Sequence, residues 1–252
     1  MRLWFRDPEA PNARGEEMEI EVAAAKIGKW ATSESGDTLE MVERPHGGFS
    51  FVLVDGQRSG RAAKAISNLV ARKVISELAQ GVRDGAAARA GHDYLYTHRG
   101  GKVSATLNIL SVDLITNTLV LSRNSRCPMI VVTAEAGIRS LDEAVEPIGV
   151  RRGTKPSITE LPLTAGTWAI VYTDGLERAG SWSSPVFDIP EKAASVLDEG
   201  EATAESLADA LLGRALELED GRPRDDISVL VLHVADRRRA HDVRRLRLRV
   251  PL

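Results

Sequence analysis

Four aspartates stand where carboxylates from distant parts of the chain could bind a metal ion. They are Asp37, Asp55, Asp174 and Asp225, and each lies beside a glycine or a second aspartate. Their segments read SGD at 35–37, FVLVDG at 51–56, IVYTDG at 170–175 and RDDISVLVLHV at 224–234. Hard divalent cations prefer oxygen ligands, and carboxylates are the usual protein source of them. The pattern predicts metal-dependent chemistry on an oxyanion substrate.

The geometry of three of these acids follows from the strands beside them. Asp55 and Asp174 end apolar runs, whereas Asp225 directly precedes one. If the three strands are antiparallel neighbours, these acids meet at one edge of one sheet. Gly56 and Gly175 allow a sharp turn there, with a backbone oxygen free to face a cation. A single Asp-Gly pair is more often just a turn, so the prediction depends on the coincidence of three acids with buried strands.

The remaining pattern is that of an α+β protein. An apolar run without alternation at 49–55 is typical of a strand buried on both faces, and helical spacing predicts helices over 58–80 and 84–97. Residues 103–113, 117–124 and 128–134 predict an antiparallel meander. Further elements are expected as strands at 19–30, 157–163, 167–174 and 227–234 and as a helix at 203–219 with Thr203 as its N-cap.

The composition and the lack of an internal linker indicate one main domain. The chain has 252 residues, 43% of them hydrophobic, and contains no internal linker. We expect an irregular segment at 1–18, a single domain at 19–235 and a basic tail at 236–252. A single cysteine, Cys127, and the lack of a signal-peptide or membrane-spanning run predict a cytoplasmic protein of bacterial type with no membrane partner.

The net charge of −3 conceals an uneven distribution of charge. The segment 236–252 has seven arginines against Asp236 and Asp242, or +5, so residues 1–235 carry −8. An acidic body suits a cation site, whereas the basic tail could bind nucleic acid, an anionic lipid surface or an acidic partner. The interpretation we favour is a solvated extension or a late edge strand, because RLRLRV alternates with a period of two.

The motifs, taken in order, resemble the PPM family of metal-dependent protein serine/threonine phosphatases (protein phosphatase type 2C). The resemblance is to its compact bacterial branch of sporulation-stage and sigma-factor regulatory phosphatases, and it covers roughly residues 20–234. The matching segments are SGD at 35–37, VLVDGQRSGRAAKAIS at 52–67, ATLNILSVD at 105–113, NSRCPMIVV at 124–132, EPIGV at 146–150, VYTDGLERA at 171–179 and RDDISVLVL at 224–232.

The resemblance implies an αββα sandwich, in which two antiparallel β-sheets are flanked by helices, with two Mn²⁺ or Mg²⁺ ions at one end. By position, Asp55 would bridge both ions and the Gly56 carbonyl would bind the first. Asp174 and Asp225 would hold the second ion, and Asp37 would act beside the first, directly or through water.

Other positions differ from the family's usual pattern or support the ligands. Asp226, next to a metal ligand, would orient its loop, and Glu40 stands where relatives have Asp and would support metal or water. Arg58 either binds phosphate or is the exposed first turn of a helix. Cys127 lacks a phosphate-cradling loop, so a structural role is favoured over a nucleophilic one.

The resemblance implies a phosphoprotein phosphatase that hydrolyses phosphoserine or phosphothreonine by attack of a metal-bridging hydroxide, which agrees with the metal-dependent chemistry predicted from the acids. The resemblance implies a phosphorylated regulatory partner in bacterial partner switching, either an anti-sigma antagonist or a stress-sensing scaffold protein. Two alternatives stay open: a catalytically weak module of the same fold that docks partners, and a nucleic-acid-binding protein that uses the tail. The five histidines show no paired spacing typical of zinc sites.

Overall fold

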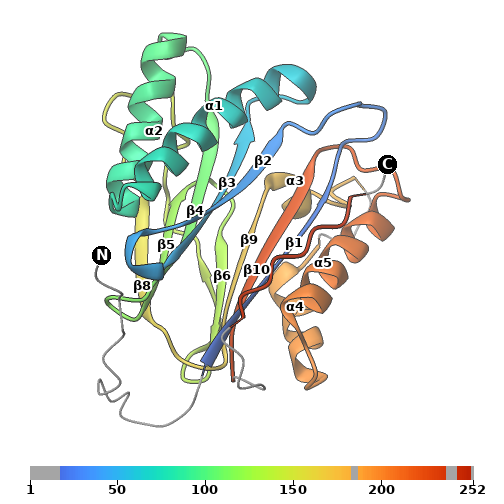
Figure 1. Ribbon diagram of the computed structural model, residues 1–252. Coiled ribbons are helices and arrows are strands. Elements are labelled where there is room, and N and C mark those ends of the chain that lie inside the picture. The colour runs from blue at the N-terminus through green and yellow to red at the C-terminus, as the bar shows by residue number, and fades with distance from the viewer. Residues whose placement is uncertain (1–17, 183–186, 237–242, 251–252) are drawn as a thin grey trace.

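The chain forms two five-stranded antiparallel sheets packed face to face, with helices on both outer faces (Figure 1). The computed structural model describes residues 18–182, 187–236 and 243–250. This arrangement confirms the predicted α+β class and the αββα sandwich. The predicted irregular segment at 1–18 lies outside the described residues except for Met18, which begins a strand.

The first sheet has the order β1-β10-β9-β6-β7. Its members are β1 (Met18–Ile27), β10 (Ile227–Asp236), β9 (Thr167–Tyr172), β6 (Met129–Thr133) and β7 (Gly137–Leu141). β9 and β10 are antiparallel neighbours in register from Thr167 opposite Val234 to Tyr172 opposite Val229. The residues that follow β9 and those that precede β10 therefore lie at the same end of this sheet.

The second sheet has the order β2-β3-β4-β5-β8. Its members are β2 (Asp37–Glu43), β3 (Phe49–Gly56), β4 (Ala105–Asp113), β5 (Thr118–Asn124) and β8 (Ser157–Pro162). A short 3₁₀ turn, η1 (Pro45–Gly47), joins β2 to β3. The register of this hairpin sets Asp37 directly opposite Asp55.

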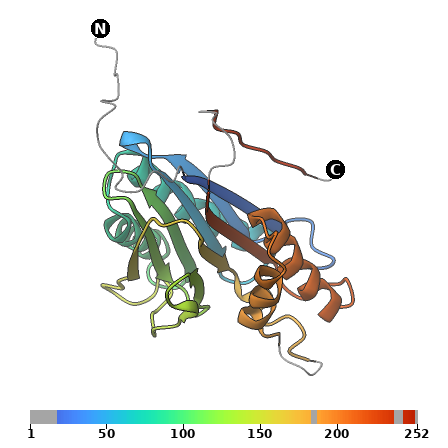
Figure 2. The ribbon, with the colours of Figure 1, turned by 90° about the horizontal axis from the view of Figure 1, so that it is seen from below.

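The helices divide between the two outer faces, as Figure 2 shows from below. α1 (Gly60–Ala79) and α2 (Asp84–Arg99) cover the second sheet, whereas α4 (Ile189–Asp198) and α5 (Ala204–Leu218) cover the first. α3 (Asp174–Glu177) is one turn directly after β9. No helix in the described part of the chain is both long and apolar enough to cross a membrane.

Alternation along β3 shows how one apolar run serves two hydrophobic layers. Phe51 and Leu53 belong to the cluster between the sheets, whereas Val52 and Val54 pack under α1 and α2. Full burial of each such side chain contributes about 1.5–3 kcal/mol. The uninterrupted run at 49–55 is thus a strand that is buried on both faces, as predicted.

Two predictions about the elements were wrong. The meander ends after β5, because β6 crosses to the other sheet and pairs with β7 and β9. Asp174 does not end a strand but opens α3, two residues after β9. Of the two forms considered for the tail, the described part, 243–250, is an exposed extension and contains no strand; Arg244 lies 3.6 Å from Glu43.

The start of α5 gives a test of local stability. Thr203 accepts a hydrogen bond from the Ser206 backbone N–H at 3.1 Å, and Ser206 Oγ accepts one from the Thr203 N–H at 2.9 Å. We expect Thr203→Ala to lower the free energy of unfolding by about 1 kcal/mol, because the Ser206 N–H at the helix end loses its acceptor and the reciprocal cap is broken. Urea denaturation measures the change. Thr203→Ser keeps the oxygen and is the control; an equal loss in both variants would contradict the capping role.

Candidate metal centre

The four predicted acids meet at one end of the sandwich, the end at which Figure 1 labels α3. Asp37 and Asp55 come from adjacent positions of the second sheet, whereas Asp174 begins α3 after β9 and Asp225 lies two residues before β10, both at the first sheet. The prediction that Asp55, Asp174 and Asp225 share one sheet edge was therefore wrong. The acids face one another across the two sheets, which places the centre between layers rather than along an edge.

Two hydroxyl groups of the first sheet hold Asp37 of the second. Thr173 Oγ1 donates to Asp37 Oδ2 at 3.1 Å, and Ser228 Oγ donates to the same oxygen at 2.6 Å. The Ser228 N–H in turn donates to Thr173 Oγ1 at 3.0 Å. Sequence reasoning missed both hydroxyl residues, although Thr173 directly precedes Asp174 and Ser228 lies three residues after Asp225.

The second oxygen of Asp37 fits a cation. Asp37 is fully buried, and its Oδ1 has no hydrogen-bond partner among the described residues. A buried carboxylate oxygen without a donor is costly unless a cation binds it. The hydroxyl groups fix one oxygen of Asp37 and leave the other free, which is how outer-shell donors orient a carboxylate ligand.

The charges of the centre also favour a bound cation. Burial, followed by the nearby carboxylates of Asp37, Asp174 and Asp225, raises the pKa of Asp55 to about 9. Burial also raises the pKa of Asp37 to about 6, against the hydrogen bond from Ser228. The pKa values of Asp174 and Asp225 are raised as well, by burial first. Like charges gathered out of water call for compensation, and divalent cations supply it.

The carboxylates surround Asp55 but do not converge on a single position at which all of them could contact one ion. No group of three or more His, Cys, Asp or Glu side chains within the described residues has the geometry to hold an ion as it stands. Asp174 Oδ2 instead pairs with Arg178 at 2.7 Å, one helical turn away. Arg178 is exposed, so this ion pair is weak and does not prevent Asp174 from binding a cation.

Two lysines that the sequence did not single out bring positive charge to the Asp37 backbone. Lys26 of β1 and Lys64 of α1 both donate from Nζ to the carbonyl oxygen of Asp37, at 2.6 and 2.7 Å. Burial, followed by the charge of Lys64, lowers the pKa of Lys26. These cations tie β1 and α1 to the start of β2, and they partly offset the acids.

Asp226 holds two loops with its carboxylate. Its Oδ1 accepts from the Lys29 N–H at 2.9 Å and its Oδ2 from the Gly36 N–H at 2.8 Å, and the residue is only 4% exposed. Both oxygens therefore have backbone donors at the two ends of the segment that leads into Asp37. This geometry supports a loop-orienting role, with Asp225 rather than Asp226 as a metal ligand.

Two glycines permit the close packing around the acids. A Cβ on Gly56 would lie 2.1 Å from the Ala63 carbonyl oxygen of α1, and one on Gly175 would lie 2.1 Å from the Asp226 carbonyl oxygen. Neither neighbour can move alone, because each is backbone. Gly175 thus lets the Asp174 turn sit against the segment that carries Asp225.

Three other predicted positions have different surroundings. Glu40 pairs with Val52 in the register, on the face of β2 opposite to Asp37, so the structure does not bring it to the acids. Arg58 is exposed two residues after Gly56, before rather than inside α1, with a φ of 76°. Cys127 is buried and donates to Glu177 at 3.3 Å; burial, followed by Glu177, raises its pKa, so it is a protonated thiol at neutral pH.

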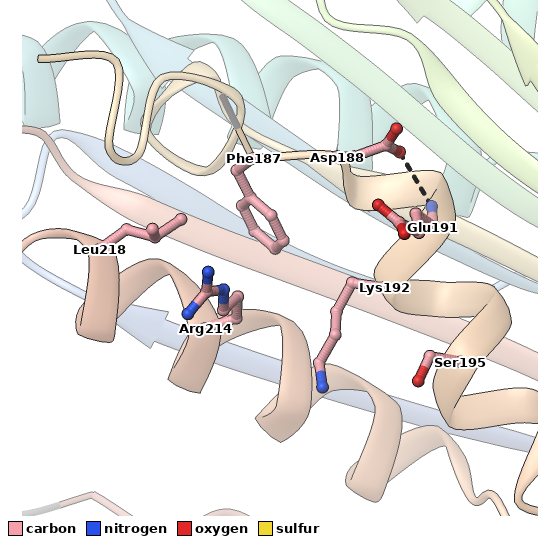
Figure 3. A pocket seen from close by; sticks show the side chains of 7 residues that line it. All are labelled: Phe187, Asp188, Glu191, Lys192, Ser195, Arg214 and Leu218. Carbon is pink, nitrogen blue, oxygen red and sulfur yellow. Dashed lines mark hydrogen bonds between the residues drawn. The ribbon is translucent and has the colours of Figure 1, made fainter. Parts of the chain in front are cut away.

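Neither of the two most evident grooves contains the acids. One, of about 300 Å³, lies between α4 and α5 (Figure 3) and is lined by Phe187, Asp188, Glu191, Lys192, Ser195, Arg214 and Leu218. Asp188 there accepts a hydrogen bond from the Glu191 N–H as the N-cap of α4. The other groove, of about 690 Å³, runs beside Asp225 and is lined by Lys29, Trp30, Glu219, Asp220, Arg222, Pro223 and Arg224.

Comparisons with known proteins identify a family and a shared fold. The family model described as stage II sporulation protein E (SpoIIE) matches residues 45–235. The comparison with curated protein sequences found no match.

Solved structures share the fold at low sequence identity. A Bacillus subtilis structure of the SpoIIE PP2C phosphatase domain with a fragment of its regulatory domain superposes with a TM-score of 0.74 at 20% identity; the match covers 88% of this chain and 65% of that one. The RsbU and RsbW domains of a Mycobacterium tuberculosis protein give 0.69 at 21%, over 88% and 61%. The catalytic domain of the M. tuberculosis phosphatase PstP, with two manganese ions, gives 0.64 at 18%, over 87% and 100%.

Proposed function

Because this chain belongs to the SpoIIE family, within the PPM (PP2C-type) serine/threonine phosphatases, we propose that it hydrolyses phosphoserine or phosphothreonine on a regulatory protein with the help of two Mn²⁺ or Mg²⁺ ions. The observation that carries the proposal is the meeting of four carboxylates from two sheets around Asp55. The Asp37 oxygen without a partner supports it further.

The roles of the ligands follow from their places. Asp55 has the other three carboxylates around it, so it would hold both ions, and the Gly56 carbonyl would hold the first. Asp174 and Asp225, from neighbouring ends of the first sheet, hold the second ion. Asp37, fixed through one oxygen by Thr173 and Ser228, serves the first ion.

When bound, such a pair of ions supplies an activated water and neutralises the oxygens of the phosphate. The chain contributes position and charge. Asp226 fixes the loops around the ligands, and Lys26 and Lys64 restrain Asp37. In this proposal the exposed guanidinium of Arg58, two residues after Gly56, binds the phosphate of the substrate. Cys127 takes no part, because its thiol is protonated and buried.

We further propose a cytoplasmic setting in bacterial partner switching. The names of the SpoIIE and RsbU structures associate this fold with cell-fate and regulatory systems. A phosphorylated antagonist of an anti-sigma factor, or a stress-sensing scaffold, is the substrate class that fits. The matches span only 65% and 61% of those two chains, so the regulation of those longer proteins is not transferred to this chain.

Hydrolysis of p-nitrophenyl phosphate tests the proposal. We expect activity with Mn²⁺, its loss in a chelator, and a fall of about 10–100-fold in Asp174→Asn, since one ion loses a ligand. Asp209→Asn, an exposed position of α5, is the matched control. Full activity in the chelator, or in Asp174→Asn, would contradict the mechanism.

The two alternatives predict different results. A docking module without catalysis binds Mn²⁺ but gives no metal-dependent hydrolysis above the Asp174→Asn level. A nucleic-acid-binding protein shows DNA affinity that falls steeply with salt and disappears when 236–252 is deleted.

Ser228 gives a test of how the centre is oriented. We expect Ser228→Ala to raise the Mn²⁺ concentration for half-maximal activity by about 10–100-fold, because Asp37 loses its shorter hydrogen bond. A metal titration of the initial rate measures this. Ser50→Ala, which removes another buried hydroxyl paired with Ser111 at 2.6 Å, is the control. Equal metal requirements in the two variants would show that Ser228 does not act on the centre.

A further inference from the structure

An aromatic and basic groove lies beside the acids and has no part in holding them. It is the groove of about 690 Å³ described above, which we call the Trp30 groove. Arg224 of its wall directly precedes Asp225, and the Lys29 N–H binds the Asp226 carboxylate. The groove therefore adjoins the segment that carries Asp225 and Asp226.

Two tryptophans in this region are exposed, although a soluble protein gains by burying them. Trp30 is 59% exposed and Trp182, next to the groove, is 80% exposed. Each stacks with an arginine of the loop between α5 and β10: Arg222 lies 5.4 Å from the Trp30 ring, and Arg224 lies 5.4 Å from the Trp182 ring. Three separate loops thus converge on one patch of the two residue types that dominate binding hot spots.

The patch is held in place by the backbone. The Trp30 N–H donates to the Pro223 carbonyl at 2.7 Å, and Ala31 follows in the left-handed region with a φ of 63°. Glu219 accepts from the Gly180 N–H at 2.8 Å through one oxygen, and its other oxygen lies 3.6 Å from Arg224. A surface with its rings already ordered loses little conformational freedom on binding.

The charges of the groove select its ligand. Lys29, Arg222 and Arg224 line it with Glu219 and Asp220, but Glu219 is occupied by Gly180 and Arg224. Within the described residues, Lys29 and Arg222 have no carboxylate at ion-pair distance. The five charged side chains that line the groove therefore sum to +1, next to aromatic faces, on a body that carries −8 over residues 1–235. Acidic groups complement such a spot.

We propose that the Trp30 groove docks an acidic segment of the phosphoprotein substrate that flanks its phosphorylated residue. Apolar side chains of that segment lie on Trp30 and Trp182, and its carboxylates pair with Lys29 and Arg222. The proposal rests on the proposed phosphatase function, which it extends to the class of substrate sequence.

Binding of peptides that cannot be hydrolysed tests the docking directly. The probes are two fluorescein-labelled peptides of equal length with alanine at the phosphorylated position, one flanked by glutamate and leucine, the other by lysine and leucine. Fluorescence anisotropy with Mn²⁺ present should show at least about tenfold tighter binding of the acidic peptide. Trp30→Ala and Arg222→Glu, both exposed, should each abolish most of that preference. Arg139→Glu, the same charge change on the far edge strand β7, should retain it.

The outcomes separate the two proposals. Equal binding of the two peptides, or an unchanged preference in both groove variants, overturns the docking surface whether or not p-nitrophenyl phosphate is hydrolysed. Absent hydrolysis with an intact peptide preference overturns the phosphatase and leaves the surface. A dimer in sedimentation that is lost in Trp30→Ala, without peptide preference, assigns the groove to a second copy of the chain and also overturns the proposal.

Discussion

Asp55→Asn is expected to lower phosphatase activity by more than about 100-fold while making the metal-free protein more stable. Loss of an outer-shell partner alone costs about 10–100-fold, so loss of the group placed to bridge both ions costs more. The amide keeps the shape of the side chain but removes its charge. Activity and stability therefore move in opposite directions, which a purely structural role for Asp55 does not predict.

The gain in stability follows from the charge cluster. Burial, then Asp37, Asp174 and Asp225, raises the pKa of Asp55 from 3.8 to about 9. The folded protein then holds a proton that the unfolded chain releases above pH ~4, so stability of the metal-free protein falls as pH rises from ~4 to ~9. The asparagine variant lacks this titrating group and should lose much of that slope. Each kcal/mol gained raises the Tm by about 2–4 °C at this size.

Thermal unfolding in a chelator at several pH values, together with p-nitrophenyl phosphate hydrolysis in Mn²⁺, measures both effects. Added Mn²⁺ should stabilise the wild type near neutral pH and have little effect on Asp55→Asn, because a ligand bound only by the folded state raises its stability. Asp209→Asn again serves as the exposed control. A variant that is inactive but less stable than the wild type at neutral pH would place Asp55 in a structural role.

The acids could be found from the sequence because strand ends and glycines mark them locally. Asp55 follows a run buried on both faces, and Asp225 precedes another, so their places needed no knowledge of the partner strands. Which strands are neighbours is a different question. The sequence suggested one shared edge, whereas β3 and β9 belong to different sheets. Periodicity indicates which faces of a strand are buried, but it does not indicate which other elements cover those faces.

The crossing of the chain between sheets was the feature least accessible to sequence reasoning. β5 ends at Asn124, whose side chain donates to the carbonyls of Glu146 and Lys155 at 3.1 Å, and the chain then leaves for the first sheet. These partners are distant in sequence, so nothing local distinguishes the crossing from a hairpin. β2 was missed for a related reason: DTLEMVE has polar residues on both faces, and tertiary contacts such as Thr38 with Ser67 satisfy them.

Gly175→Ala should be the most damaging conservative change at the centre outside its ligands. The added Cβ would lie 2.1 Å from the Asp226 carbonyl oxygen and 3.1 Å from Ile227 Cγ1. The turn that carries Asp174 must then move away from the segment that carries Asp225. We expect a loss of about 3 kcal/mol or more in the free energy of unfolding, because backbone has to shift. Activity should fall by about 100-fold, since a displacement near 1 Å separates the two ligands of one ion.

Gly213→Ala is the matched control for that change. Gly213 lies inside α5 with open space around its would-be Cβ, so alanine there should stabilise the helix by about 0.5–1 kcal/mol and leave hydrolysis unchanged. Urea denaturation and Mn²⁺ titration of the rate compare the two variants. If Gly175→Ala bound Mn²⁺ and hydrolysed substrate as well as Gly213→Ala does, the spacing of Asp174 and Asp225 would not depend on the close approach of Gly175 to the Asp226 carbonyl. The second ion would then need ligands other than that pair.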